Sequence, residues 1–351
     1  MSAFAFAFLS LSMVMLMGNV WTISDLIIRK GVDVMDAMKI FIYFLPSIIR
    51  YTIPLSFLLG VLLAVGRLVA DNEIVAINVA GVSLMRVLSI FLTIGLIFSM
   101  ALLVLYNKTI PEFQYRYRSE LKNIYSKNIG ALIEPGIFLE GFQNFIVYIS
   151  DIDSNKMKNV FIYELGAKEG VSKITFAKRG EFVVEKSILK MKLEDGFRDE
   201  TNAQNKNELY RLNFKIFFMD IPIKDKKTTK IKKKPADMSI QELREKIGSL
   251  QAQGVHPIEL IAEIHERLNF CFSIITFIIL GFSVALMVRH REKAINFGLA
   301  FLIAGIYYLL FILGKTLVEH HIVIPSLGMW LPNIIILALA LILLKKNVHF
   351  R

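Results

Sequence analysis

Residues 66–87 read GRLVADNEIVAINVAGVSLMRV and lie between two apolar runs, 51–65 and 88–105. Both runs have the apolar composition of segments that cross a hydrocarbon core about 30 Å thick. The stretch between them has the pattern of a short helix and carries Asp71 and Glu73. It is therefore either a turn between two membrane helices or a segment on which another protein acts.

Six windows of the chain have the length and low charge of a membrane span. They are 1–20, 51–66 (which 38–49 extends), 87–106, 269–288, 295–314 and 326–344. The composition agrees, because 55% of the 351 residues are hydrophobic and the mean hydropathy is +0.54. The first window begins at Met1 with neither a basic n-region nor a cleavage site. We interpret it as a membrane helix whose cytoplasmic lead-in is missing, and not as a signal peptide.

Several function classes are disfavoured by the sequence. The net charge of +11 is concentrated in the middle of the chain, so it does not indicate nucleic-acid binding. The single cysteine, Cys271, excludes an intrachain disulfide framework, and no His/Cys cluster predicts a metal or a cofactor. Gly314-Lys315-Thr316 lacks the first glycine of a P-loop, which would fall at Leu309. Carboxylates are essentially missing from the six windows, so we expect no catalytic site in them. If the protein transports a substrate, we expect another protein to supply the energy.

The distribution of Lys and Arg predicts the orientation in the membrane. One set of connections holds eight such residues: Arg67, Arg86, Arg289, Arg291, Lys293, Lys345, Lys346 and Arg351. The opposite short connections hold four: Arg29, Lys30, Lys39 and Lys315. The first set, with the stretch 66–87, is therefore predicted to be cytoplasmic. The long segment 107–255 then lies on the far side of the membrane.

This long segment predicts a β domain. Stretches 189–193 and 212–216 alternate between apolar and polar residues, and others are rich in β-branched and aromatic residues. Short strands at this spacing are typical of a sandwich or partial barrel. Seven of the eleven residues 224–234 are lysine, which makes this stretch a solvated linker or a site of attraction for anionic head groups. Ser239 and Glu242 have the spacing of a capping box, so a helix is expected to start there.

The predicted fold class is a membrane α-helical protein with six transmembrane helices, three on each side of an inserted all-β domain. The predicted domains have three ranges. Residues 1–106 hold the first three spans and the helix near 70–80. Residues 107–237 hold a helical lead-in, the β domain and the lysine-rich linker. Residues 238–351 hold an amphipathic helix and the last three spans.

Five stretches of the chain, in order, resemble the permeases of the lipopolysaccharide exporter, the LptF/LptG (YjgP/YjgQ) family. They are DLIIRKGVD (25–33), LPSIIRYTIPLSFLLGVLLAVGRL (45–68), ADNEIVAINVAGVSL (70–84), IELIAEIHERLNFCFSIITFIILGFSVAL (258–286) and YYLLFILGKTLVEHHIVIPSLGMWLPN (307–333). The resemblance covers nearly the whole chain, and its wording leans towards LptF. Asn19 departs from it, because many relatives carry a lysine near that position.

The resemblance implies a mechanism. Two such permeases, LptF and LptG, pair in the bacterial inner membrane above a cytoplasmic LptB-type ATPase dimer. The pair takes lipopolysaccharide from the outer leaflet and passes it into periplasmic β-jellyroll domains, which join an LptC/LptA-type bridge to the outer membrane. No cofactor, metal or nucleic acid is implied.

The resemblance also implies site residues. Asp71 and Glu73 would contact basic groups of the ATPase, and Gly81 would let the chain turn back into the third span. The expected lipid-binding residues are Asn19, Arg29, Lys30 and Arg50 near the mouth of the cavity, with Leu189, Met191, Phe214 and Ile216 in the β domain. The four β-domain residues are as readily explained as the core of that domain, and Arg29 and Lys30 as interfacial anchors.

A second function stays open from the residues alone. A membrane-anchored sensor could bind a ligand through its β domain and relay the signal through the spans. Such proteins normally carry a cytoplasmic output domain, and no long cytoplasmic segment is predicted here. A membrane enzyme is a weaker alternative, because the spans lack polar residues.

Overall fold

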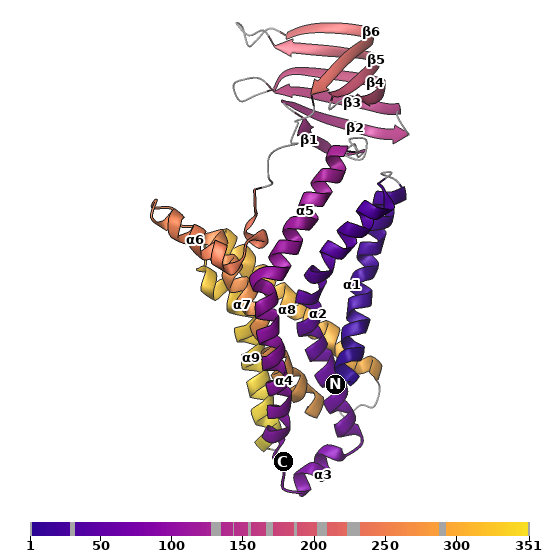
Figure 1. Ribbon diagram of the computed structural model, residues 1–351. Helices are drawn as coiled ribbons and strands as arrows, with labels where there is room; N and C mark the ends of the chain where they lie inside the picture. The colour runs from indigo at the N-terminus through magenta and orange to yellow at the C-terminus, as the bar shows by residue number, and fades with distance from the viewer. Residues whose placement is uncertain are drawn as a thin grey trace. The chain divides into compact units, whose positions relative to one another are not determined.

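The computed structural model describes residues 2–28, 32–127, 135–142, 144–153, 156–165, 171–185, 188–201, 209–222, 232–287 and 293–349. The chain divides into two compact units. A helical unit comprises Met1–Thr22, Lys39–Arg118 and Lys232–Arg351, and a second unit comprises Ile23–Met38 and Ser119–Ile231. The second unit contains the β-sheet (Figure 1).

Long apolar helices build the helical unit. They are α1 (Ser2–Ile28), α2 (Val34–Ala70), α4 (Leu84–Val104), α7 (Ile258–Met287), α8 (Lys293–Glu319) and α9 (Pro325–His349). Helix α4 continues through a π-helical turn, η1 (Leu105–Thr109), into α5 (Ile110–Lys127). In the described part of the chain, six helical segments are long and apolar enough to cross a membrane. The six predicted spans, three before and three after the insertion, are therefore confirmed.

Helix α7 is the most deeply packed helix of its unit. In its most apolar window 72% of the residues are buried, against 33% in α8 and 11% in α1. Its Cys271 is buried, and the Ser99 hydroxyl of α4 donates to the Cys271 carbonyl at 2.8 Å. The apolar faces that α1 and α8 leave exposed suit contact with lipid or with another protein, because neither offers unsatisfied backbone groups.

Helices α8 and α9 form a hairpin in which their backbones touch. A Cβ atom added to Gly314 of α8 would lie 2.1 Å from the carbonyl oxygen of Gly328 in α9. A Cβ atom added to Gly328 would lie 2.3 Å from Cγ2 of Val318. Small residues allow such close approach of membrane helices, and here no side chain larger than hydrogen fits.

The second unit contains a six-stranded antiparallel sheet in which each strand pairs with the next along the chain. The strands are β1 (Phe138–Phe142), β2 (Phe145–Asp153), β3 (Lys156–Leu165), β4 (Val171–Glu185), β5 (Ile188–Thr201) and β6 (Leu209–Pro222). The inserted β domain is confirmed. The described strands form a meander, and the Greek-key crossovers that a jellyroll requires are not among them.

The buried face of the sheet changes from one set of alternate residues to the other partway along the strands. Asn159 in β3 and Asp195 in β5 have left-handed φ values of 48° and 55°. A residue in this conformation bends a strand and increases its twist. In β6, Met219 and Ile221 are buried, whereas Phe214 packs against the same core from an even-numbered position. A strict period of two therefore fails across this bend.

The return from the second unit is marked by a short turn and a capped helix. The 3₁₀ turn η3 (Pro235–Asp237) precedes α6 (Ile240–Gln251). The predicted capping box is confirmed: the Glu242 amide donates to Ser239 Oγ at 3.1 Å, and the Ser239 amide donates to the Glu242 carboxylate at 2.8 Å. The Lys233 ammonium and the Ser239 amide, which donate to this carboxylate, hold the pKa of Glu242 below its usual range.

Candidate functional site

Helix α3 (Glu73–Val79) is a short helix between the long helices α2 and α4. Its Ile74 is fully buried in the core of the helical unit, which fixes one side of the helix. Glu73 and Asp71 are exposed, and Asp71 lies 3.6 Å from Arg67 in an exposed ion pair. In Figure 1, α3 lies at the end of the helical unit opposite α6.

Both ends of α3 are set by residues with left-handed backbone conformation. Asn72 at the start has φ 59°, and Gly81 after the last turn has φ +82°. The Val82 amide donates to the Ile77 carbonyl, and the Gly81 amide donates to the Asn78 carbonyl. These two bonds form a Schellman motif, which ends the helix and turns the chain into α4. Glycine suits this place, because it adopts positive φ without a steric penalty.

The outward side of α3 combines apolar surface with negative charge. Val75 and Val79 are 47% and 83% exposed, and their spacing of four residues places them on one face. Glu73 begins the same seven-residue helix. Exposed apolar side chains next to a carboxylate form a surface that can dock an apolar and basic partner.

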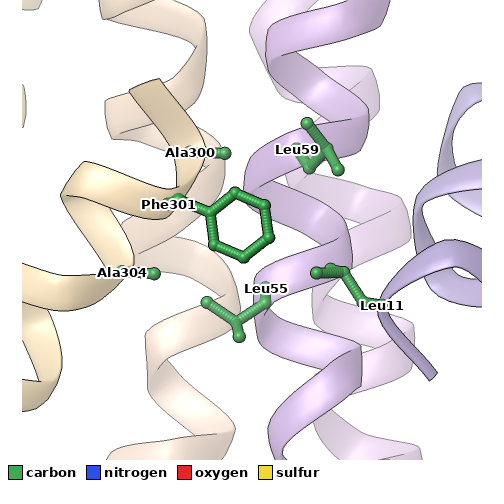
Figure 2. A pocket seen from close by; sticks show the side chains of 6 residues that line it. All are labelled: Leu11, Leu55, Leu59, Ala300, Phe301 and Ala304. Carbon is green, nitrogen blue, oxygen red and sulfur yellow. The ribbon is translucent and has the colours of Figure 1, made fainter. Parts of the chain in front are cut away.

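An apolar crevice opens between three helices of the same unit (Figure 2). It holds about 240 Å³ of space, including the part open to the surroundings. Its lining residues are all apolar: Leu11 of α1, Leu55 and Leu59 of α2, and Ala300, Phe301 and Ala304 of α8. A crevice of this chemistry can accept hydrocarbon, and it offers no hydrogen-bond partner to a polar ligand.

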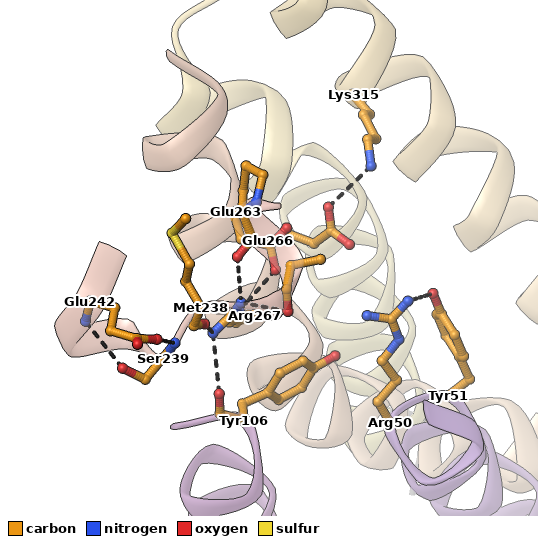
Figure 3. Close-up of polar contacts among 12 residues, drawn as sticks. Arg50, Tyr51, Tyr106, Met238, Ser239, Glu242, Glu263, Glu266, Arg267 and Lys315 are labelled. Carbon is orange, nitrogen blue, oxygen red and sulfur yellow. Dashed lines mark hydrogen bonds and ion pairs between the residues drawn. The ribbon is translucent and has the colours of Figure 1, made fainter. Parts of the chain in front are cut away.

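The predicted head-group residues have different surroundings. The Asn19 amide donates to the Met15 carbonyl one turn earlier, at 3.2 Å. The Arg50 guanidinium lies 4.4 Å from the centre of the Tyr51 ring and donates to the Tyr51 hydroxyl (Figure 3). Arg29 and Lys30 lie outside the described residues. Arg50 is thus half-buried among aromatic side chains instead of extending freely from the bundle.

The four predicted residues of the β domain do not share one face. Leu189 and Met191 are buried in the core of the sheet, and Phe214 packs against that core. Ile216 is 54% exposed. The bend near Asp195 explains the difference, because it moves the buried face of β6 from Phe217 to Phe214 and leaves Ile216 on the other side.

A charged cluster in α7 lies outside the membrane spans that were predicted from the sequence. Glu263, Glu266 and Arg267 lie in the first half of this 30-residue helix, before the predicted start of the span at 269. Glu266 is only 9% exposed, and its carboxylate accepts from the Lys315 ammonium of α8 at 3.4 Å (Figure 3). The expectation that the predicted windows lack carboxylates concerns 269–288 and is not tested by this cluster, but helix α7 itself begins earlier and includes these charged residues. The signal was present as acidic and basic residues at helical spacings of three and four.

A second polar network ties three helices together inside the bundle. The Asn333 amide of α9 donates to the side-chain oxygen and the backbone carbonyl of Asn269 in α7, at 2.7 and 2.9 Å. The Asn269 amide donates to the Tyr307 hydroxyl of α8 at 3.0 Å. All three residues are buried. Such interhelical hydrogen bonds hold membrane helices together where the hydrophobic effect does not.

Comparison with known proteins adds one finding. A family model described as lipopolysaccharide export system permease LptF/LptG matches residues 1–346. This model takes the two permease types together and does not separate them. A search of curated proteins finds no match.

Proposed function

Because the chain belongs to the lipopolysaccharide export system permease family LptF/LptG, we propose that it is one of two paired permeases that extract this lipid from the inner membrane with energy from a separate ATPase. The chain is a multi-pass membrane protein and a transporter component, not a catalytic enzyme. The wording of residues 70–84 favours the LptF type. The partners in this proposal are a second permease, an LptB-type ATPase dimer and LptC/LptA-type bridge proteins.

The exposed helix α3 is the observation that carries the energy-coupling part of the proposal. It is short, its buried Ile74 ties it to the core of the bundle, and it presents two exposed valines beside Glu73. A force applied to α3 by a docked ATPase would therefore reach α2 and α4 directly. Asp71, Glu73 and Gly81 are the residues we assign to this contact, with Gly81 acting through the turn that ends α3.

The apolar crevice supports a role in lipid extraction. Its six lining residues come from α1, α2 and α8, and only 11% of the residues in the apolar window of α1 and 33% of those in the window of α8 are buried. A hydrocarbon chain in this crevice would lose contact with neighbouring lipid and gain contact with protein. Asn19, Arg29, Lys30 and Arg50 are proposed to act on the phosphorylated head group. The guanidinium and ammonium groups of Arg29, Lys30 and Arg50 suit phosphate best, whereas Asn19 offers only a neutral amide donor.

The β domain is proposed to receive the lipid on the periplasmic side. Leu189, Met191, Phe214 and Ile216 stay candidates for acyl contact, with Phe214 the best placed, because it is partly buried and packs at the edge of the core. Leu189 and Met191 would have to leave a closed core to contact lipid, so we expect a smaller role for them.

One reconstitution tests the proposed function. The chain would be purified with a second permease of this family and an LptB-type ATPase, and placed in liposomes that contain lipopolysaccharide. We expect ATP-dependent transfer of the lipid to an added periplasmic bridge protein. A complex that hydrolyses ATP and binds the bridge protein but releases no lipid would contradict the proposal.

Filling the crevice should block lipid without unfolding the protein. Ala304→Trp places a large ring among the six lining side chains, so binding of lipopolysaccharide to the purified complex should fall by roughly tenfold. Leu302→Trp is the matched control, because Leu302 lies on the same helix and is 61% exposed. Equal binding by both variants and the parent protein, at equal melting temperatures, would exclude a role of the crevice in lipid binding.

A further inference from the structure

Arg267 of α7 makes an unusually complete set of contacts for a buried arginine. It is 1% exposed. Its Nε donates to the Glu263 carboxylate at 2.9 Å, and its two terminal nitrogens donate to four backbone carbonyl oxygens (Figure 3). The carbonyls belong to Tyr106 at 3.2 Å, Pro235 at 3.1 Å, Ala236 at 3.3 Å and Met238 at 2.8 Å. These five bonds match the five N–H donors of a guanidinium.

The four carbonyls come from two segments whose backbone departs from a regular α-helix. Tyr106 lies in the π-helical turn η1, where the extra residue disturbs the usual hydrogen-bond ladder. Pro235, Ala236 and Met238 form or follow the 3₁₀ turn η3, in which the Pro235 carbonyl also accepts from the Met238 amide at 3.2 Å. Arg267 therefore binds the backbone of both segments. The contact depends on where the two segments lie and not on which side chains they carry.

A second tie joins the same regions. The Arg118 guanidinium of α5 pairs with the carboxylate of Asp237 in η3. The Asp237 side chain is 1% exposed, and its carboxylate also accepts a hydrogen bond from the Lys234 amide at 3.0 Å. The outgoing helix η1–α5 and the returning segment η3 are thus bound to each other by Arg118 and to α7 by Arg267.

The location of these ties points to more than local stability. The helical unit ends at Arg118 on the way out and begins again at Lys232 on the way back. Arg118 and Asp237 therefore lie within a few residues of the two places where the chain leaves and re-enters this unit. Both are bound, directly or through η3, to α7. In the apolar window of α7 72% of the residues are buried, against 11% in α1 and 33% in α8.

We propose that Arg267 is a positioning residue for lipid transfer, which holds both junctions of the β insertion against α7. The inference rests on the proposed function. When the less packed helices α1 and α8 move around the crevice, the two junctions keep their places relative to α7. Both ends of the insertion then stay attached to the same helix throughout each cycle.

The test separates lipid transfer from ATP hydrolysis in the reconstituted complex. Arg267→Gln would be compared with Arg267→Lys and the parent, with lipopolysaccharide as the probe and a photoreactive phenylalanine analogue at position 214. We expect ATP hydrolysis to stay within about twofold, while lipid adducts at position 214 fall by roughly tenfold or more, because misplacement by about an ångström can lower a reaction rate by about a hundredfold. Hydrogen exchange at residues 235–238 should rise. Arg267→Lys should fall in between, because an ammonium has fewer donors and no planar fork.

A matched pair of variants keeps the test valid if Arg267→Gln does not fold. Arg118→Gln breaks the tie to Asp237, whereas Arg116→Gln breaks an exposed pair with Glu112 on the same helix, at 2.6 Å. We expect Arg118→Gln to lower adduct formation and Arg116→Gln to leave it unchanged.

The outcomes distinguish the two proposals. Adducts at parental level in Arg267→Gln and Arg118→Gln, with faster exchange at 235–238, would show that the ties only stabilise the fold. An equal loss of ATP hydrolysis and adducts in these variants would also overturn the positioning role. No adduct in the active parent complex would instead overturn the proposed route of the lipid through the β domain, and this inference with it.

Discussion

Gly314→Ala should destabilise the packing of α8 on α9 by about 1–3 kcal/mol or more, although it adds a single methyl group. The added Cβ atom would lie 2.1 Å from the carbonyl oxygen of Gly328, and that oxygen belongs to backbone, which cannot rotate away as a side chain can. The helices must then separate along their contact. This would also strain the buried bonds between Asn269, Tyr307 and Asn333. Thermal unfolding of the purified protein in detergent measures the effect.

Helix α8 contains its own control for this substitution. A Cβ atom on Gly305 would meet nothing within 4 Å, so Gly305→Ala introduces the same methyl group without a clash. We expect Gly305→Ala to leave the midpoint temperature of thermal unfolding unchanged or to raise it slightly, because alanine is more favourable than glycine in a helix by about 1 kcal/mol. Equal midpoints for the two variants would mean that α8 and α9 do not touch at Gly314 in the protein.

Glu73→Lys should weaken binding of the ATPase by roughly tenfold or more and lower export accordingly. The variant removes one charged contact, which is worth about 1–3 kcal/mol, and places a like charge opposite basic groups of the partner. Folding should be unaffected, because Glu73 is exposed and the core contact of α3 is made by Ile74. Co-purification of the ATPase and a titration of its binding measure the loss.

Two comparisons make the coupling prediction specific. Glu73→Gln removes only the charge and should have a smaller effect in the same direction. Glu245→Lys reverses the charge of an exposed residue on α6, at the other end of the helical unit, and should bind the ATPase like the parent. If Glu73→Lys retains the ATPase as well as Glu245→Lys does, α3 is not the contact.

The spans and the inserted sheet could be predicted because each follows from local composition. An apolar run of sufficient length has few alternatives to a membrane helix, and alternating residues such as Leu189, Met191 and Leu193 follow the period of a strand. The period failed at Ile216, because the face that a strand buries also depends on bends in its neighbours. Asp195 creates such a bend, and its local signal is the Asp195-Gly196 pair, because Asp-Gly is a dipeptide typical of turns.

The polar contacts inside the bundle could not be predicted for a related reason. A hydropathy window ends at the first charged residues, so it placed the start of the fourth span after Glu266 and Arg267. The structure extends α7 to Ile258 and supplies their partners from distant segments, Lys315 of α8 and the carbonyls near Pro235. A buried charge is tolerated once it is paired, and the pairing becomes visible only when the helices are placed side by side.

The burial of Cys271 makes the protein well suited to spectroscopy. It is the one cysteine among 351 residues, and it is only 5% exposed within α7. Reagents that modify accessible thiols would therefore leave the native chain largely unlabelled. A cysteine introduced at an exposed position, such as Val79 on α3 or Gln241 on α6, would carry a spin label or fluorophore without prior removal of a native thiol. Distances between such labels could follow the two ends of the helical bundle through each round of nucleotide hydrolysis.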